Sequence, residues 1–118
     1  MNFVSIIMGS KSDYEIMKNC ADTFEKFNVK YEMIISSAHR SPERTKKYVK
    51  EAEEKGAVAF IAAAGMAAHL AGALAAATTK PVIGVPMKGG AMDGMDAMLS
   101  TVQMPSGMPV ATVALGKA

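Results

Sequence analysis

Short apolar segments alternate with segments of helical periodicity along the whole chain. Apolar runs that predict strands occur at residues 3–8, 31–35, 58–63, 81–85 and 110–115. Helical patterns lie between them, beginning near residues 12, 42, 67 and 93. Strands that are joined through helices form right-handed crossovers and pair in parallel. The alternation therefore predicts a doubly wound α/β domain with a central parallel sheet.

Length and composition narrow the classes of protein that this chain can belong to. The 118 residues predict one domain, residues 1–118, and the 50% hydrophobic content is enough for a core. The formal charge is +2, without a basic stripe interleaved with aromatics, which disfavours nucleic-acid binding. Cys20 is the only cysteine, and we expect it to be a small core residue. A lone cysteine also suits a protein of a reducing compartment, by default the cytoplasm. The apolar residues 1–8 are too few to span a membrane.

Several local signals predict where helices begin and how they are buried. Ser12 and Glu15 have the spacing of a capping box, and Ser41-Pro42 is typical of a helix start. Residues 67–77 are nearly all Ala, Leu and Gly. A helix that is apolar all round has to be buried. We therefore expect it between the sheet and another subunit.

Four turns are predicted to meet at the carboxyl edge of the sheet, where open α/β proteins bind their ligands. They are Gly9–Asp13, Ser37–Arg40, Ala64–His69 and Pro86–Gly90. The expected meeting of all four turns is stronger evidence for a ligand-binding site than any single turn. No Walker motif, GxGxxG motif, metal triad or Ser/His/Asp arrangement occurs in this pattern.

The polar residues of these turns suit an anionic ligand and a proton transfer, although each has a plainer explanation. Glycine, hydroxyls and free amides at a helix start suit phosphate, but they also serve as caps. Asp13 could bond sugar hydroxyls or only favour the helix dipole. His39 can exchange protons near neutral pH, and the Arg40 fork suits phosphate or carboxylate. His69 could be a packed, hydrogen-bonded core histidine or a functional one.

The turns together resemble one family, the bacterial class I N5-carboxyaminoimidazole ribonucleotide mutases of purine biosynthesis. The resemblance runs from end to end through five motifs, MGSKSD (8–13), SAHR (37–40), AGMAAHL (64–70), GVP (84–86) and VQMPSGMPV (102–110). It implies a flavodoxin-like three-layer α/β/α sandwich that assembles as a homo-octamer. It also implies conversion of N5-carboxyaminoimidazole ribonucleotide to 4-carboxyaminoimidazole ribonucleotide, without metal or organic cofactor.

The resemblance also implies a role for individual residues. Ser10, Ser12 and Arg40 would hold the 5′-phosphate, Asp13 would hold the ribose, and His39 would transfer the proton. The carboxylate that migrates would be framed by the remaining predicted substrate-binding residues, namely Ser37, Ala38, Ala64, Gly65, Ala67, Ala68 and His69. A small closed pocket would keep released CO2 near its acceptor. The implied partner is a small-molecule substrate, with neither nucleic acid nor membrane.

Some positions depart from what the resemblance leads us to expect. Met66 and Ala71 stand where Gly and Pro are expected, and Met66 would narrow the carboxylate pocket. The Lys88-Gly89-Gly90 loop replaces a Ser-rich one. The expected family pattern continues past Ala118 into a further helical segment, so we expect the chain to lack that segment.

Two rival functions stay open on the sequence. One is the related class II enzyme, which carboxylates aminoimidazole ribonucleotide directly with CO2; the Ala67–Leu70 segment favours class I. The other is a non-catalytic flavodoxin-like module that binds a nucleotide or flavin, or that receives a phosphoryl group. Asp13 is the only acid in the first three turns, which argues against a phosphoryl receiver.

Overall fold

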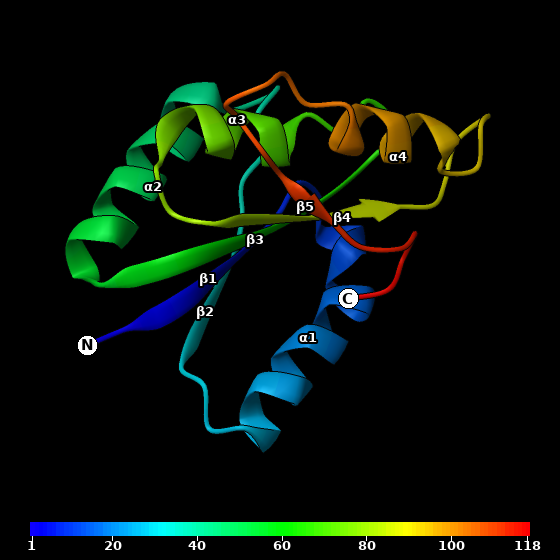
Figure 1. Ribbon diagram of the computed structural model, residues 1–118. Coiled ribbons are helices and arrows are strands. Elements are labelled where there is room, and N and C mark those ends of the chain that lie inside the picture. The colour runs from blue at the N-terminus through cyan, green and yellow to red at the C-terminus, as the bar shows by residue number, and fades with distance from the viewer.

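A five-stranded parallel sheet forms the middle of the molecule, in the order β2-β1-β3-β4-β5 (Figure 1). The computed structural model describes all residues, Met1–Ala118. The strands are β1 Phe3–Met8, β2 Tyr31–Ile35, β3 Ala57–Gly65, β4 Val82–Met87 and β5 Ala111–Thr112. The order reverses between β1 and β3, as in flavodoxin-like folds. The predicted fold class is confirmed.

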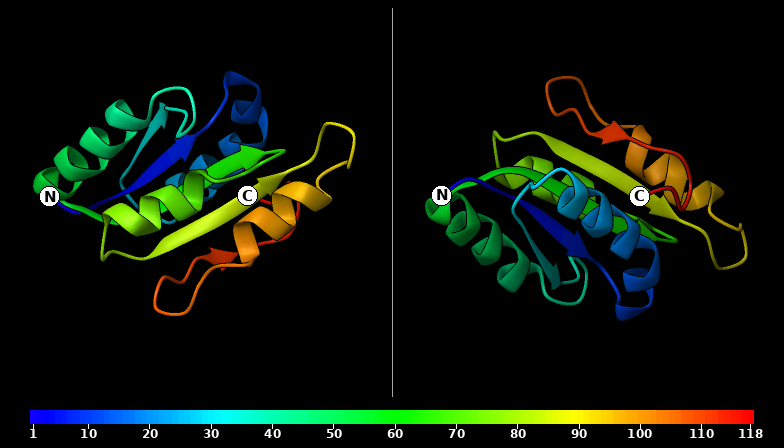
Figure 2. Two further views of the ribbon diagram at one scale, coloured as in Figure 1. Left: turned by 90° about the horizontal axis from the view of Figure 1, so that it is seen from above. Right: turned by 90° about the horizontal axis from the view of Figure 1, so that it is seen from below.

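Helices cover both faces of the sheet and make three layers (Figure 2). They are the short 3-10 helix η1 Lys11–Asp13, α1 Tyr14–Lys26, α2 Pro42–Lys55, α3 Leu70–Ala77 and α4 Met95–Val102. The helix α1 covers one face, and α2, α3 and α4 cover the other. Both α3 and α4 approach β4 at Gly84, where an added Cβ would lie 3.2 Å from Ala71 Cβ and 2.4 Å from Thr101 Cγ2. None of these helices is long and apolar enough to cross a membrane.

The side-chain alternation of the strands divides the core into two apolar clusters. Ile7 and Phe60 face α2 and α3, whereas Ile6 and Met8 face Met17 of α1. All five side chains are buried. Met8 and Met87, at the carboxyl ends of β1 and β4, are buried in the second cluster, so the loops that follow these strands start from a packed base.

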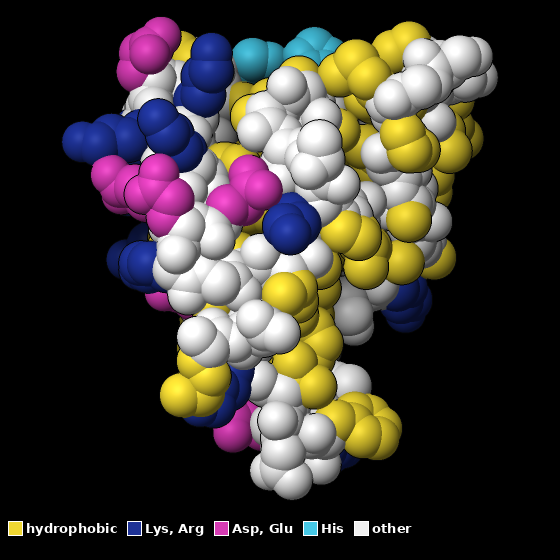
Figure 3. Space-filling model, turned by 60° about the vertical axis from the view of Figure 1, so that its left-hand side comes forward, with side chains coloured by type: hydrophobic (Ala, Val, Ile, Leu, Met, Phe, Trp, Pro, Cys, Tyr) yellow, Lys and Arg dark blue, Asp and Glu magenta, His cyan; other side chains and the backbone are white.

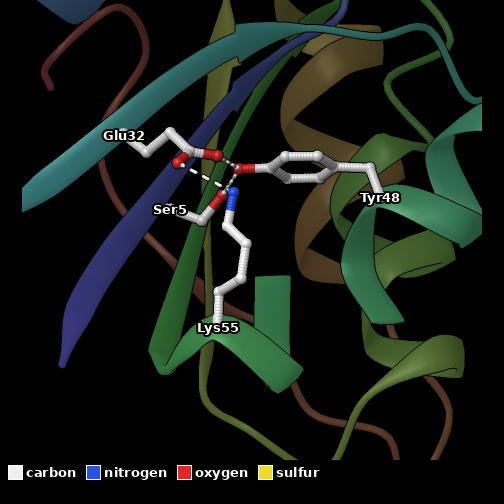
Figure 4. A network of polar contacts seen from close by, with 4 residues as sticks. All are labelled: Ser5, Glu32, Tyr48 and Lys55. Carbon is white, nitrogen blue, oxygen red and sulfur yellow. Dashed lines mark hydrogen bonds and ion pairs between the residues drawn. The ribbon is translucent and has the colours of Figure 1, made fainter. Parts of the chain in front are cut away.

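A partly buried polar network links the sheet to α2 (Figure 4). The Ser5 hydroxyl, fully buried in β1, lies 2.7 Å from the Tyr48 hydroxyl. Tyr48 donates to Glu32 Oε1 at 2.8 Å, and Lys55 Nζ lies 3.6 Å from Glu32 Oε2. Because Ser5 and Glu32 are paired across β1 and β2, the network fixes α2 against this edge of the sheet.

Several predicted boundaries and contacts were wrong. The Ser12–Glu15 capping box does not form, because Ser12 lies in η1, where its N–H donates to Ser10 Oγ at 3.3 Å. The helices α3 and α4 begin later than predicted, and β5 has two residues instead of six. The apolar run 31–35 is typical of a buried strand, but β2 lies at the edge of the sheet, and Ile35 is 40% exposed. Cys20 is buried in α1, as predicted.

Candidate active site

Four loops surround one cavity of about 360 Å³ at the carboxyl edge of the sheet. Three of them follow β1, β2 and β3, and the fourth follows β4. The lining residues are Gly9, Ser10, Ser12, Asp13, Ser37, Ala38, His39, Arg40, Ala64, Gly65, Met66, Ala67, His69, Leu70, Met87, Lys88, Gly89 and Gly90. The predicted convergence of the four turns is therefore confirmed.

The loop after β1 presents two hydroxyls beside the start of a helix. Ser10 Oγ lies 3.0 Å from Ser12 Oγ, and both residues are exposed. Gly9 is held against β3, because its N–H donates to the Ala63 carbonyl at 2.9 Å. The hydroxyls and the nearby N–H groups can therefore surround an anion at this side of the cavity.

Hydrogen bonds from the first turn of α2 hold the loop after β2 in place. Thr45 Oγ1, which is buried, lies 2.7 Å from Ser36 Oγ and donates toward the Ser37 and Ser41 carbonyls. Ser37 Oγ accepts from the Arg40 N–H at 3.1 Å. These bonds fix the turn that carries the histidine and the arginine. Sequence reasoning missed Thr45, although a threonine facing the core four residues after a helix start was a usable signal.

The two histidines of the chain meet across the cavity mouth. His39 Nε2 lies 2.9 Å from His69 Nδ1, and the rings are edge to face with their centroids 5.0 Å apart. Both side chains are exposed, and Figure 3 shows them together at the top of the molecule. The core interpretation of His69 is therefore wrong. His69 reaches this position because it lies at the N-cap of α3, where the loop after β3 ends.

The loops after β3 and β4 form the remaining wall. Gly65, Ala67 and Gly90 give it small side chains, and Met66 reaches across it. Ala68 is not among the lining residues, because its side chain is 1% exposed and packs into the interior. It is the one predicted site residue that the structure does not bring to the cavity.

The charges around the cavity favour an anionic ligand. Arg40 and Lys88 are exposed cations, and neither takes part in the ion pairs of the chain. Asp13 is the only acid in the lining. Burial raises the pKa of its carboxyl, against a smaller opposing effect of a backbone hydrogen bond from Ser10. The structure also shows no group of three or more His, Cys, Asp or Glu side chains that could hold a metal ion.

Sequence reasoning found most of the polar lining but missed part of the wall. Met87, Lys88 and Gly90 were placed in a turn at the ligand-binding edge, but none of them was named as a site residue, and neither was Leu70. Lys88 follows a strand that was predicted to end at the same edge, and this was a usable signal. Met87 gave none, because a methionine at a strand end is most often a core residue.

Comparison with known proteins identifies the family. The family of AIR carboxylase matches residues 3–118. The N5-carboxyaminoimidazole ribonucleotide mutase of Pyrococcus horikoshii is 57% identical over 115 residues, which cover 98% of this chain and 65% of that protein. The protein of the same name from Bacillus subtilis is 54% identical, with 98% and 71% covered.

The fold of the chain agrees with this assignment. A crystal structure of Treponema denticola PurE superposes with a TM-score of 0.87 at 29% identity, covering 98% of this chain and 73% of that one. The chain thus spans about two thirds to three quarters of the length of these relatives. The match over residues 3–118 and the identities above 50% show that the chain belongs to the AIR carboxylase family.

Proposed function

We propose that the protein is an isomerase that converts N5-carboxyaminoimidazole ribonucleotide to 4-carboxyaminoimidazole ribonucleotide. The observation that carries the proposal is the shared cavity, in which His39 lies with Ser10, Asp13 and Gly65. Relatives that are 54–57% identical carry the name of this mutase. Neither metal nor organic cofactor enters the proposed reaction.

The phosphate end of the substrate is assigned to the loops after β1 and β2. Ser10 and Ser12 offer hydroxyls 3.0 Å apart, and Arg40 offers a guanidinium that has no ion-pair partner in the chain. Asp13, partly desolvated beside them, would accept hydrogen bonds from ribose hydroxyls. Charge-assisted bonds of this kind hold the substrate far from the bond that reacts, which supplies binding energy for positioning.

The carboxylate end is assigned to Ser37, Ala38 and the loop Ala64–Ala68. Their small side chains leave room for CO2, and backbone N–H groups could bond its oxygens. Ala68 lies behind this wall and does not line the cavity, since the whole residue is 1% exposed. Retention of CO2 beside its acceptor raises the effective concentration of the reactant.

His39 is assigned the proton transfers. As the N–C bond of the carbamate breaks, the imidazole gives a proton to the nitrogen, and CO2 is released. The ring carbon C4 then attacks CO2, and the imidazole takes up the proton that C4 loses. The two transfers cancel, so the enzyme returns to its starting state. The hydrogen bond to His69 orients the ring through Nε2 and leaves Nδ1 of His39 for the substrate.

Direct carboxylation is the second candidate, because the matching family is named for AIR carboxylase. That reaction needs the same proton removal from C4 but takes CO2 from solution. A turnover assay separates the two. A mutase consumes the carbamate with no added bicarbonate, whereas a carboxylase needs bicarbonate and aminoimidazole ribonucleotide. Conversion that occurs only in the second assay would overturn the mutase assignment.

The proposal extends to assembly, domain organisation and location. An exposed apolar stripe runs along α4 and the loop before it, made of Met92, Met95, Leu99 and Val102, each 47–57% exposed. On the face drawn in Figure 3, most charged side chains lie toward the left and most hydrophobic ones toward the right. These features support an assembly in which α4 meets another subunit. We propose that this assembly is a homo-octamer and that the alanine-rich α3 also meets another subunit. Residues 1–118 would act as one mutase domain, and the buried, unpaired Cys20 suits the cytoplasm.

A further inference from the structure

Met66 occupies an unusual place in the cavity wall. Its φ is +52°, in the left-handed region that favours glycine. The other two non-glycine residues with positive φ are Asn28 and Asp93, whose short polar side chains tolerate this region better. Met66 is also 61% exposed, although it is a large apolar residue on the lining. Strain of this kind is retained where a side chain has a task at a site.

The Met66 side chain crosses from the loop after β3 to the loop after β4. A Cβ added to Gly90 would lie 3.1 Å from Met66 Cγ and 3.3 Å from its Sδ. The side chain therefore lies directly against the Gly90 backbone, where φ is +71°. The neighbouring Gly89 has nothing within 4 Å of the same added atom. The contact with Gly90 is thus specific, and it spans two of the four loops that bound the cavity.

The position of this bridge matters for a reaction that releases CO2 inside the cavity. Gly65 and Ala67, on either side of Met66, belong to the part of the wall that is assigned to the migrating carboxylate. The bridge is a flexible thioether, which fills irregular gaps without polar groups that would hold water. It would cover this part of the cavity between the loops after β3 and β4.

We propose that Met66 determines how much of the released CO2 is recaptured, by closing the gap between the two loops against Gly90. The inference rests on the proposed mutase function. Recapture forms the C4–C bond and gives 4-carboxyaminoimidazole ribonucleotide. If CO2 escapes from the cavity, the nitrogen that has taken the proton stays an amine, and the product is aminoimidazole ribonucleotide. The escaped CO2 combines with water to give bicarbonate and a proton. The share of substrate that ends as aminoimidazole ribonucleotide therefore measures escape.

The test compares this share in the wild-type chain and in Met66→Gly, after subtraction of the decay without enzyme. Glycine suits the positive φ, so folding should be preserved. We expect the escaping share to rise at least threefold, with KM changed less than twofold because the phosphate end is untouched. Asn28→Gly is the matched control, since Asn28 is also a non-glycine residue with positive φ and lies outside the lining, and its share should equal that of the wild type.

A second pair of variants tests the contact from the other loop. Gly90→Ala places a methyl group against Met66 and should displace it, which raises escape. Gly107→Ala also carries a Cβ at positive φ and touches nothing, and Gly107 lies outside the lining, so the escaping share should not rise. Turnover with unchanged shares in both Met66→Gly and Gly90→Ala would overturn the role of Met66 alone. No conversion of the carbamate by the wild-type chain would overturn the proposed function, and this inference with it.

Discussion

Replacement of Tyr48 by phenylalanine tests whether the network in Figure 4 holds α2 on the sheet. The Ser5 hydroxyl is fully buried, and Tyr48 is its only hydrogen-bond partner. In Tyr48→Phe it stays buried without a partner, which costs about 1–3 kcal/mol of unfolding free energy. Glu32 loses less, because it is partly exposed and keeps Lys55. We therefore expect a loss of about 2 kcal/mol, the middle of that range.

A double-mutant cycle separates this cause from a loss of packing. Ser5→Ala removes the buried hydroxyl and leaves the bond between Tyr48 and Glu32 intact, so it should cost about 1 kcal/mol or less. In the double variant no hydroxyl is orphaned, and its loss should be clearly smaller than the sum of the single losses. Urea unfolding at one fixed protein concentration measures all four chains, and the slope should not change. A double variant whose loss of unfolding free energy equals the sum of the two single losses would refute the coupling between Ser5 and Tyr48.

The same residue predicts a dependence on alkaline pH. Burial raises the pKa of Tyr48 to about 12; the bond to Ser5 opposes the shift, and Glu32 adds to it. A phenol with a raised pKa contributes full stability below its ordinary value near 10 and loses it as the pH rises toward 12. The stability gap between wild type and Tyr48→Phe should therefore be constant from neutral pH to about 10 and should narrow above it.

The remaining predictions concern the cavity and the assembly. Arg40→Ala should weaken substrate binding by about 1.5–3 kcal/mol, the value of a hydrogen bond to a charged group. Arg44→Ala is the control, because Arg44 lies outside the lining, and it should bind substrate as the wild type does. Equal affinity of the wild type for the substrate and for its dephosphorylated form would contradict the phosphate role of Arg40. Asp13→Asn should weaken binding yet raise the melting temperature at pH 7. Burial raises the Asp13 pKa, so the wild type loses stability as the pH rises through that pKa, and the advantage of the variant should vanish near pH 3.8; a constant advantage would contradict this. Leu99→Lys should lower the oligomeric mass seen by light scattering, and an unchanged mass would remove the α4 stripe from the interface.

The architecture could be predicted from the sequence because its signals are local and repeated. Strands β1 and β2 begin and end where their patterns predicted, and helix α2 begins where its pattern predicted. Apolar runs separated by helices leave few topologies, and parallel pairing brings the loops together. The predicted ends of helices and strands were wrong where the backbone conformation of single residues determined them. The start of α4 depends on Gly94 at φ +98°, and β5 is short because only two of its residues pair with β4.

The sequence could predict which loops form the candidate site but not which side chains contact each other there. A pattern can place His39 and His69 at one edge of a sheet, but it cannot show that their ring nitrogens lie 2.9 Å apart. The core interpretation of His69 failed because an alanine-rich surrounding suggests burial, whereas the residue lies at the exposed start of α3. Met66 was expected to narrow the pocket; its contact with Gly90 depends on positive φ angles that no periodicity encodes.

The most direct test of the account follows the migrating carboxylate itself. The substrate is prepared with ¹³C in the carbamate and is turned over in unlabelled bicarbonate, by the wild-type chain and by His39→Asn. We predict that the wild-type product keeps most of the label at the carboxylate on C4, and that His39→Asn binds substrate but forms almost no product. A product that carries the unlabelled carbon of the buffer, or undiminished turnover by His39→Asn, would contradict a closed cavity in which His39 moves the proton.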